Sequence, residues 1–212
     1  MKDVTLGDLQ ESVQDRFAFA TLKDYFNICS AFLGFLEKTH PTRVISPSHP
    51  NYIFYQYGPE YGHRITRPLN ADLLSESAPR FADEFERFIA FLDDLKRYRQ
   101  AAASRRANKQ YVESNQINGT IYTIQQTIGS IADSFDNPNQ SRKRAGQLFE
   151  GLVKLVIQRI GLLCESRTIS IPIPDYPGYE MSYELDLVFS RGKAIIASET
   201  KLLIPYVVFG CV

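Results

Sequence analysis

The sequence predicts an α/β protein in which a mainly helical N-terminal region, residues 1–138, precedes a core of one helix and several strands, residues 139–212. Two observations lead to this prediction. Apolar residues recur at helical spacing over much of the first part of the chain, and β-prone runs separated by turn residues follow one another after about residue 168. The length of 212 residues suits one large domain, or a domain with a substantial appendage.

Three helices are predicted in the N-terminal region. The first covers residues 6–37, the second about 78–107 and the third, which is more polar, about 111–134, and each has apolar residues at helical spacing. Residues 40–70 contain five prolines with tyrosines between them, so we expect a loop with one or two short strands there. The run Asp136-Asn137-Pro138-Asn139 then interrupts the helical pattern.

The pattern changes after residue 140. Ser141 can cap a helix, which we expect to run to about Leu163 because apolar residues such as Leu148 and Leu152 form a stripe along it. Three or four strands follow, at about residues 168–173, 180–189, 194–201 and 206–211.

The composition excludes several classes of protein. Hydrophobic residues make up 44% and charged residues 23% of the chain, values that argue against disorder, collagen and coiled-coil rods. The sequence has no run of 18 apolar residues, so no membrane span is predicted. Cys29, Cys164 and Cys211 are isolated and odd in number, so we expect reduced thiols in a cytoplasmic protein.

The formal net charge is zero, but the charge is unevenly distributed. Residues 1–95 hold 9 basic and 14 acidic residues, residues 96–144 hold 9 and 3, and residues 145–212 hold 6 and 7. A basic middle can attract a polyanion whatever the total charge, although a solvated helix face is the alternative. The residues that we expect to contact DNA phosphates there are Arg105, Arg106, Arg142, Lys143 and Arg144.

The stretch from Tyr183 to Lys201 has the pattern of a β-hairpin. Two β-prone runs flank the turn sequence Ser190-Arg191-Gly192-Lys193, which contains a glycine. A turn of these four residues would pair Phe189 with Ala194, and that pairing sets the register of the whole hairpin.

In this register, Asp186 pairs with Ala197. Residues that pair across strands share a face, and so do residues two apart on one strand, so Glu199 and Lys201 are predicted to lie on the face of Asp186. Glu199 is then the diagonal neighbour of Asp186, roughly 7–8 Å away. A slip of one residue would separate the two carboxylates.

Two carboxylates at this separation can share a divalent cation. Mg²⁺ prefers oxygen ligands and usually takes only one or two protein carboxylates together with substrate phosphate. Such an ion activates water and stabilises the charge of the phosphate. The amine of Lys201 can orient or help to deprotonate the attacking water.

Asp186, twelve intervening residues and then Glu199-Thr200-Lys201 resemble the active-site signature of the PD-(D/E)XK nucleases. In that family the aspartate and the glutamate bind Mg²⁺ and the lysine assists the water. Leu185 stands where the signature has its nominal proline, a position that often varies in the family. The resemblance implies a restriction-endonuclease-like core, in which a central mixed sheet has flanking helices.

The helix that precedes the hairpin adds to the resemblance. The run from Arg144 to Glu150, Arg-Ala-Gly-Gln-Leu-Phe-Glu, resembles the first core helix of several type II restriction endonucleases. Glu150 would then support the metal site, whereas a surface glutamate is the alternative. The resemblance covers residues 141–212, and because the chain stops inside the apolar run that ends at Val212, we expect a core that is shortened at its C-terminus.

The resemblance implies a type II restriction endonuclease: an enzyme that hydrolyses double-stranded DNA at specific sequences, needs Mg²⁺, uses no organic cofactor and acts as a homodimer. Its catalytic residues would be Glu150, Asp186, Glu199 and Lys201, and its metal ligands Asp186 and Glu199. Two alternatives stay open. One is a DNA-binding or assembly module that keeps the nuclease fold without cleaving, and the other is a repair or structure-selective nuclease.

Overall fold

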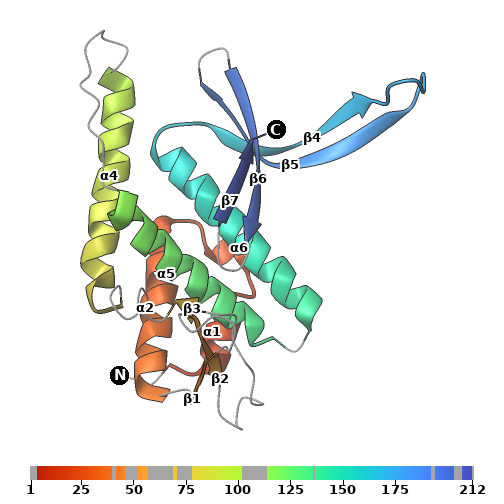
Figure 1. Ribbon diagram of the computed structural model, residues 1–212. Helices are drawn as coiled ribbons and strands as arrows, with labels where there is room; N and C mark the ends of the chain where they lie inside the picture. Colours follow the sequence, from red (N-terminus) through yellow and green to blue (C-terminus); the bar gives the residue numbers. More distant parts are fainter. Residues whose placement is uncertain are drawn as a thin grey trace.

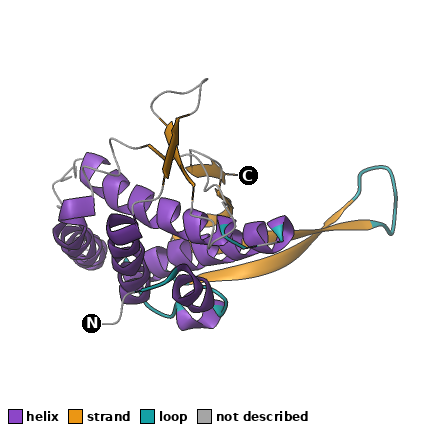
Figure 2. Cartoon of the chain, turned by 90° about the horizontal axis from the view of Figure 1, so that it is seen from below, coloured by secondary structure: helices purple, strands orange, loops and turns teal. Residues whose placement is uncertain are grey.

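The computed structural model describes residues 4–39, 42–45, 52–56, 69–70, 78–101, 114–135, 137–191, 194–202 and 207–211. Helices form one side of the molecule, and a sheet lies beside the last of them (Figure 1). Part of this sheet continues away from the body as a long two-stranded arm (Figure 2). None of the described helices combines the length and apolarity needed to cross a bilayer.

The single helix predicted over residues 6–37 is in fact three elements: α1 (Leu6–Ser12), the 3-10 helix η1 (Arg16–Ala18) and α2 (Leu22–Thr39). Two local signals cause the interruption. In the first turn of α1, Thr5 and Asp8 form a capping box. Nine residues after the end of α1, the backbone N–H of Thr21 donates a 2.7 Å hydrogen bond to the Asp24 carboxylate, an arrangement that starts a new helix.

Three short strands follow α2: β1 (Thr42–Ile45), β2 (Tyr52–Gln56) and β3 (Leu69–Asn70). They form an antiparallel sheet in the order β1-β2-β3. This small sheet lies in the region where the sequence predicted a loop with one or two strands.

The next two helices are α4 (Phe81–Ala101), which follows the 3-10 turn η3 (Ala78–Arg80), and α5 (Ser114–Asp133). The α5 helix was predicted as a more polar helix, yet its described part is largely enclosed, because α1, α2, α4 and α6 all pack against it. Ile124, Ile128 and Ile131 are buried, and so are several polar residues of the same helix. The buried polar residues of α5 are Thr120, Thr123, Gln125, Gln126, Thr127 and Ser130.

The helix that leads into the second sheet is α6 (Pro138–Arg159). Asn137, not the predicted Ser141, caps it: the Asn137 side chain accepts hydrogen bonds from the backbone N–H groups of Asn139 and Gln140. Pro138 occupies the first helical position, where its fixed φ suits a helix start. The predicted cap, Ser141, is buried inside the helix.

The α6 helix ends four residues before the predicted Leu163, in a Schellman motif. Gly161 adopts a left-handed φ of 81°, which glycine tolerates without strain. Its N–H donates to the carbonyl of Gln158, and the N–H of Leu162 donates to the carbonyl of Ile157. This cap turns the chain directly into the first strand of the second sheet.

The second sheet contains β4 (Cys164–Pro172), β5 (Glu180–Arg191), β6 (Ala194–Leu202) and β7 (Val207–Cys211), in that spatial order. Every neighbouring pair is antiparallel. The mixed sheet implied by the sequence resemblance is therefore not found among the strands that the structure describes.

One cluster of buried side chains runs from α1 through the helices to Cys164 and Leu187 of the sheet. Within it, the hydroxyl of Tyr25 in α2 donates a 2.6 Å hydrogen bond to the carbonyl of Leu148 in α6. The α6 helix thus contacts both the N-terminal helices and the strands. The predicted division near residue 138 falls at the start of this helix and stays a prediction.

Candidate active site at the β5–β6 hairpin

The β5–β6 hairpin is formed as predicted, but its register differs by two residues. Ala194 pairs with Arg191, and Phe189 pairs with Ile196, so only residues 192 and 193 separate the paired strands. The expected pairing of Phe189 with Ala194 is therefore wrong. Side chains alternate between the two faces along a strand, so a shift of two residues does not change the face of any residue. Each residue of β6 therefore keeps the face that was predicted for it relative to Phe189.

The corrected register changes the predicted relation between Asp186 and Glu199. The last pair of the β5–β6 ladder is Leu187 with Ser198. Asp186 and Glu199 are the next residues beyond this pair on their strands. They therefore occupy corresponding positions on the two strands, whereas the predicted register made them diagonal neighbours. On its other edge, β6 pairs with β7, with Glu199 opposite Gly210 and Lys201 opposite Val208. The side chains of Asp186, Glu199 and Lys201 lie outside the described part of the structure.

A β-bulge lies at the position of Asp186. Between β4 and β5, Arg167 pairs with Leu185, whereas Glu165 pairs with Val188. Ser166 alone therefore faces the two residues 186 and 187. Leu187 and Val188 are consecutive and both buried. This is expected beside a bulge, where the regular alternation of side chains is interrupted and β5 has a strand on each side. Because a bulge interrupts alternation, the predicted sharing of one face by Asp186 and Glu199 stays a prediction.

Glu150 reaches this bulge from α6. Its carboxylate Oε1 accepts a 3.0 Å hydrogen bond from the hydroxyl of Ser166. The structure thus brings the predicted supporting acid to the residue of β4 that stands opposite Asp186. Ser166 was not singled out from the sequence, in which a serine within an exposed strand carries no signal of such a contact.

Charged groups from α6 and β4 also act on the neighbouring thiol of Cys164. Burial raises the pKa of Cys164, the carboxylates of Glu150 and Glu165 raise it further, and the ammonium group of Lys154 acts against them. Lys154 follows Glu150 by one helical turn, so α6 presents one negative and one positive group to this end of the sheet. A carboxylate and a hydroxyl are oxygen donors of the kind that Mg²⁺ prefers.

The residues that would hold the metal are only partly described. Among the described side chains, no group of three or more histidines, cysteines, aspartates and glutamates has the arrangement of a metal site. The side chains of Asp186 and Glu199 are not among the described ones. The fit of this site to a metal ion therefore rests on the backbone pairing of the hairpin and on the contact between Glu150 and Ser166.

The basic residues predicted to contact DNA are described only in part. Arg142 and Lys143 are exposed and Arg144 is half-buried, on the first turns of α6. The last two, together with the exposed ring of Phe17 in η1, line a pocket of about 440 Å³. Arg105 and Arg106 lie outside the described residues.

No protein-family model matches the chain, and no curated protein matches it. The chain is similar in structure to the type IIP restriction endonuclease Kpn2I, with a TM-score of 0.54 and 15% sequence identity. The similarity covers 89% of this chain and 63% of that enzyme, so the chain spans less than two thirds of its length. At this identity the likeness shows the fold alone: a restriction-endonuclease-like fold that includes the helical N-terminal part.

Proposed function

We propose that the chain is a Mg²⁺-dependent endodeoxyribonuclease of the type II restriction class, which cuts double-stranded DNA at a specific sequence. The observation that carries the proposal is the pairing of β5 and β6, in which Asp186 and Glu199 are the next residues beyond the pair Leu187–Ser198. Glu150, held by Ser166, adds a third carboxylate at the same end of the sheet. The fold similarity to a restriction endonuclease is consistent with this activity.

In the proposed site, Asp186 and Glu199 hold the cation. When bound, Mg²⁺ supplies positive charge against the scissile phosphate and increases the acidity of water. Lys201 orients the attacking water and helps to remove its proton. The water oxygen forms a bond to phosphorus, the bond from phosphorus to the 3′ oxygen breaks, and that oxygen takes a proton from solvent, which leaves a 5′-phosphate and a 3′-hydroxyl.

The remaining residues position the substrate and the ligands. The hydrogen bond from Ser166 fixes the orientation of Glu150, which supports the metal site from α6. Arg142, Lys143 and Arg144 neutralise phosphates, which sets the position of the duplex without reading its sequence. The proposal includes a homodimer, whose two-fold symmetry matches a palindromic site, and a cytoplasmic location.

The proposal is tested by plasmid cleavage with and without Mg²⁺, using the native chain, Asp186→Asn and Lys201→Met. We expect discrete fragments from the native chain only. Glu184→Gln is the matched control, because Glu184 is an exposed carboxylate on the same strand, paired with Thr168 and not with β6. This control should cleave like the native chain.

Three outcomes would contradict the proposal. DNA binding without cleavage in either Mg²⁺ or Mn²⁺ would indicate the non-cleaving module. Cleavage of branched DNA in preference to plasmid would indicate a repair nuclease. Equal loss of activity in the Glu184→Gln control would show that a carboxylate on this strand is needed for folding and not for the reaction.

A further inference from the structure

A pocket of about 440 Å³ lies where η1 meets the first turns of α6. Two of the residues that line it, Lys143 and Arg144, are cations that would neutralise phosphates in the proposed function. The pocket is more varied than a phosphate site, because an aromatic ring, amide groups and a carboxylate line it as well. These groups belong to Phe17, to Asn139, Gln140 and Gln147, and to Asp15.

The backbone around Phe17 is held by hydrogen bonds. Its N–H donates a 2.8 Å hydrogen bond to Oδ1 of Asp15, and the N–H of Ala18 donates to the carbonyl of Asp15. Phe19, two residues later, is buried and packs against Tyr25, with the ring centroids 4.9 Å apart. Phe17 by contrast is 77% exposed, so most of its ring surface faces solvent and adds little to the core.

The pocket lies on the same stripe of α6 as Glu150. Gln140, Lys143, Gln147 and Glu150 follow one another at intervals of three, four and three residues, and side chains with this spacing share one face of a helix. Because an α-helix rises 1.5 Å per residue, Gln147 lies roughly 5 Å and Lys143 roughly 10 Å from Glu150 along the axis. In duplex DNA these distances correspond to about one to three base pairs.

The groups in the pocket match the edge and the ring of a base. Glutamine and asparagine can form two hydrogen bonds with adenine, phenylalanine makes apolar contact with the methyl group of thymine, and a carboxylate accepts a hydrogen bond from the amino group of cytosine. Asp15 would repel a phosphate. Its carboxylate already accepts a bond from the N–H of Phe17 and has further lone pairs for a donor on a base. The carboxylate therefore favours a base over a phosphate as the occupant.

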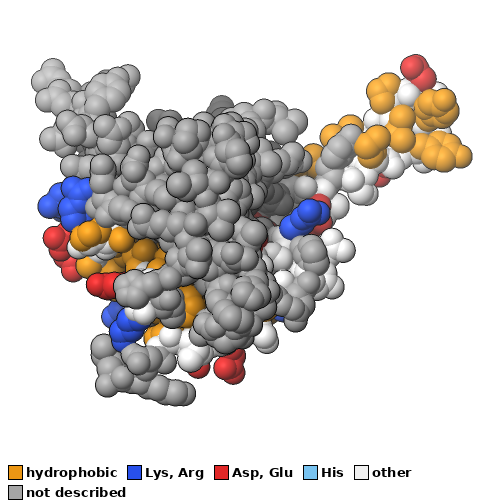
Figure 3. Space-filling view, turned by 60° about the horizontal axis from the view of Figure 1, so that its bottom comes forward, with side chains coloured by type: hydrophobic (Ala, Val, Ile, Leu, Met, Phe, Trp, Pro, Cys, Tyr) orange, Lys and Arg blue, Asp and Glu red, His pale blue; other side chains and the backbone are white. Residues whose placement is uncertain are grey.

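Exposed aromatic side chains also occur at the tip of the arm that β4 and β5 form. Tyr176 and Tyr179 are 64% and 67% exposed there, in the hydrophobic group that Figure 3 shows at the end of the arm. The one basic residue between positions 165 and 184 is Arg167, which forms an ion pair with Glu165. DNA binding depends on neutralisation of phosphates, so we expect the pocket beside Phe17, and not the tip of the arm, to contact DNA.

We propose that this pocket binds one base of the DNA sequence that the enzyme cuts, with the ring of Phe17 in contact with the base and the side chains of Gln147 and Asp15 hydrogen-bonded to its edge. The inference rests on the proposed nuclease function and deepens it. Lys143 and Arg144 position the duplex through its phosphates, whereas Phe17 and Gln147 contribute to the choice of sequence.

The first experiment selects the sequences that the full chain binds from a duplex library with random central positions. Ca²⁺ replaces Mg²⁺, because it binds the same kind of oxygen ligand. We expect the native chain to enrich one sequence. Phe17→Ala and Gln147→Ala should each lower the preference at one position of that sequence at least about tenfold, the discrimination that a good base contact supplies, and leave the other positions unchanged.

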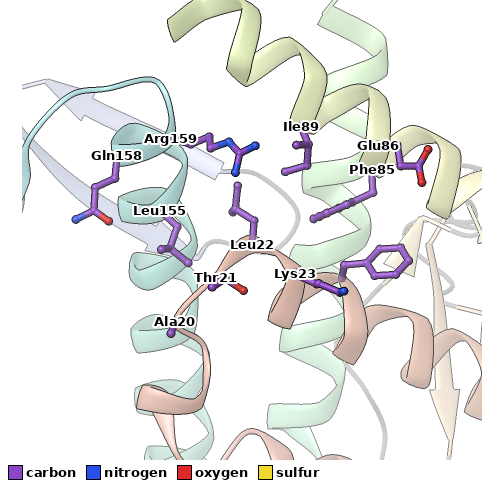
Figure 4. A pocket seen from close by; sticks show the side chains of 11 residues that line it. Ala20, Thr21, Leu22, Lys23, Phe85, Glu86, Ile89, Leu155, Gln158 and Arg159 are labelled. Atoms are coloured by element: carbon purple, nitrogen blue, oxygen red, sulfur yellow. The ribbon is translucent and has the colours of Figure 1, made fainter.

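Two variants are the matched controls. Tyr176→Ala removes an exposed aromatic ring from the arm. Gln158→Ala removes an exposed amide roughly 16 Å along α6 from Gln147, where it lines a different and mainly apolar pocket of about 600 Å³ (Figure 4). Both controls should keep the native preference at every position. Circular dichroism checks that each variant is folded.

The second experiment separates contact with a base from contact with phosphates. Binding is measured on the selected duplex and on a duplex that is changed at the affected position. Lys143→Gln should weaken both complexes by a similar factor and reduce their salt dependence, because a phosphate contact carries no sequence information. Gln147→Ala should weaken the complex with the selected duplex alone.

The proposal is overturned if the native chain fails to bind the library or binds it without preference. It is also overturned if Phe17→Ala and Gln147→Ala select the native sequence unchanged, or weaken binding to every sequence equally. Neither experiment measures cleavage, so the two failures are distinguishable. Specific cleavage with an unchanged preference in both variants would refute the pocket alone, and selection of a base without cleavage in Mg²⁺ would refute the nuclease alone.

Discussion

The hydroxyl of Ser166 in β4 donates a 3.0 Å hydrogen bond to the carboxylate of Glu150 in α6. The bond joins the helix to the sheet at the residue that stands opposite the bulge at Asp186. A carboxylate at a metal site depends on such a partner for its orientation, and removal of the partner weakens metal binding or activity. We therefore expect substitution of Ser166 to affect metal-dependent activity, whereas substitution of a surface serine without such a contact would not.

Ser166→Ala should lower Mg²⁺-dependent cleavage by on the order of tenfold and raise the Mg²⁺ concentration needed for half-maximal activity. Ser166→Thr, which keeps a hydroxyl, should restore much of the loss. Ser170→Ala is the control, because Ser170 is exposed on the same strand and pairs with Ser182 on the arm. An unchanged Mg²⁺ requirement in Ser166→Ala would mean that the bond has only a structural role.

Gly151→Ala should destabilise the fold by about 1–3 kcal/mol, because added atoms in a packed interior force displacement of their neighbours. A Cβ at position 151 would lie 2.8 Å from the hydroxyl oxygen of Tyr25, which is fully buried and bonded to the Leu148 carbonyl. Urea unfolding measures the change in the free energy of unfolding.

Gly146, on the same helix, provides the comparison, since a Cβ there meets no atom within 4 Å apart from the neighbouring backbone of the helix itself. Gly146→Ala should stabilise the protein by about 0.5–1 kcal/mol through helix propensity alone. Tyr25→Phe removes the clashing oxygen, so Gly151→Ala should cost less in that background. Equal costs in both backgrounds would rule out the predicted contact.

The ion pair between Asp93 and Arg159 joins α4 to α6 and should make stability depend on pH. The hydrogen bond from Arg159 lowers the pKa of Asp93 below its usual value. The pair therefore contributes stability above the unfolded-state pKa of about 3.9, and this contribution is lost as the pH falls through the lower folded-state pKa.

Arg159→Gln should accordingly lower the urea midpoint at pH 7, and its difference from the native chain should shrink as the pH falls below the unfolded-state pKa of Asp93. Arg97→Gln removes a pair within α4, with Asp94, and should have a smaller effect at every pH because it joins no second element. A deficit in Arg159→Gln that persists unchanged at acidic pH would indicate lost packing of the side chain and not a lost ion pair.

Cys29 should resist alkylation as long as the protein is folded. Burial raises its pKa to about 12, and the side chain is fully enclosed. Because the thiolate is the reactive form, roughly one Cys29 in ten thousand is ionised at pH 8. Peptide mapping after iodoacetamide treatment should find Cys29 labelled only when urea unfolds the chain. Labelling at the rate of a model thiol in native buffer would contradict the described core.

The sequence predicted the order of helices and strands, since that order follows from local periodicity and turn residues. It misplaced the start of α6, because Pro138 was taken to break a helix when it occupies the first helical position after the Asn137 cap. The break between α1 and α2 was missed for the same kind of reason: the capping side chains lie within a continuous apolar pattern.

The candidate site was predictable only as far as spacing allows. Spacing identified the β5–β6 hairpin, but the composition of its turn does not distinguish pairing of Ala194 with Phe189 from pairing with Arg191. The bulge depends on how β4 pairs with β5, and the sequence of β5 alone does not indicate it. Likewise, the partner of Glu150 comes from a strand 16 residues away, and only the tertiary fold brings Ser166 to it.

The enclosure of α5 has a consequence for the dynamics of the molecule. Four helices surround it, and Ile124, Ile128 and Ile131 are fully buried. Amide hydrogens in such a segment exchange with solvent only when its neighbours separate, which in a small protein requires global opening. The slowest-exchanging amides should therefore lie in the middle of α5, and their exchange rates would report the stability of the whole fold. The arm beyond the bulge should exchange orders of magnitude faster in the isolated monomer.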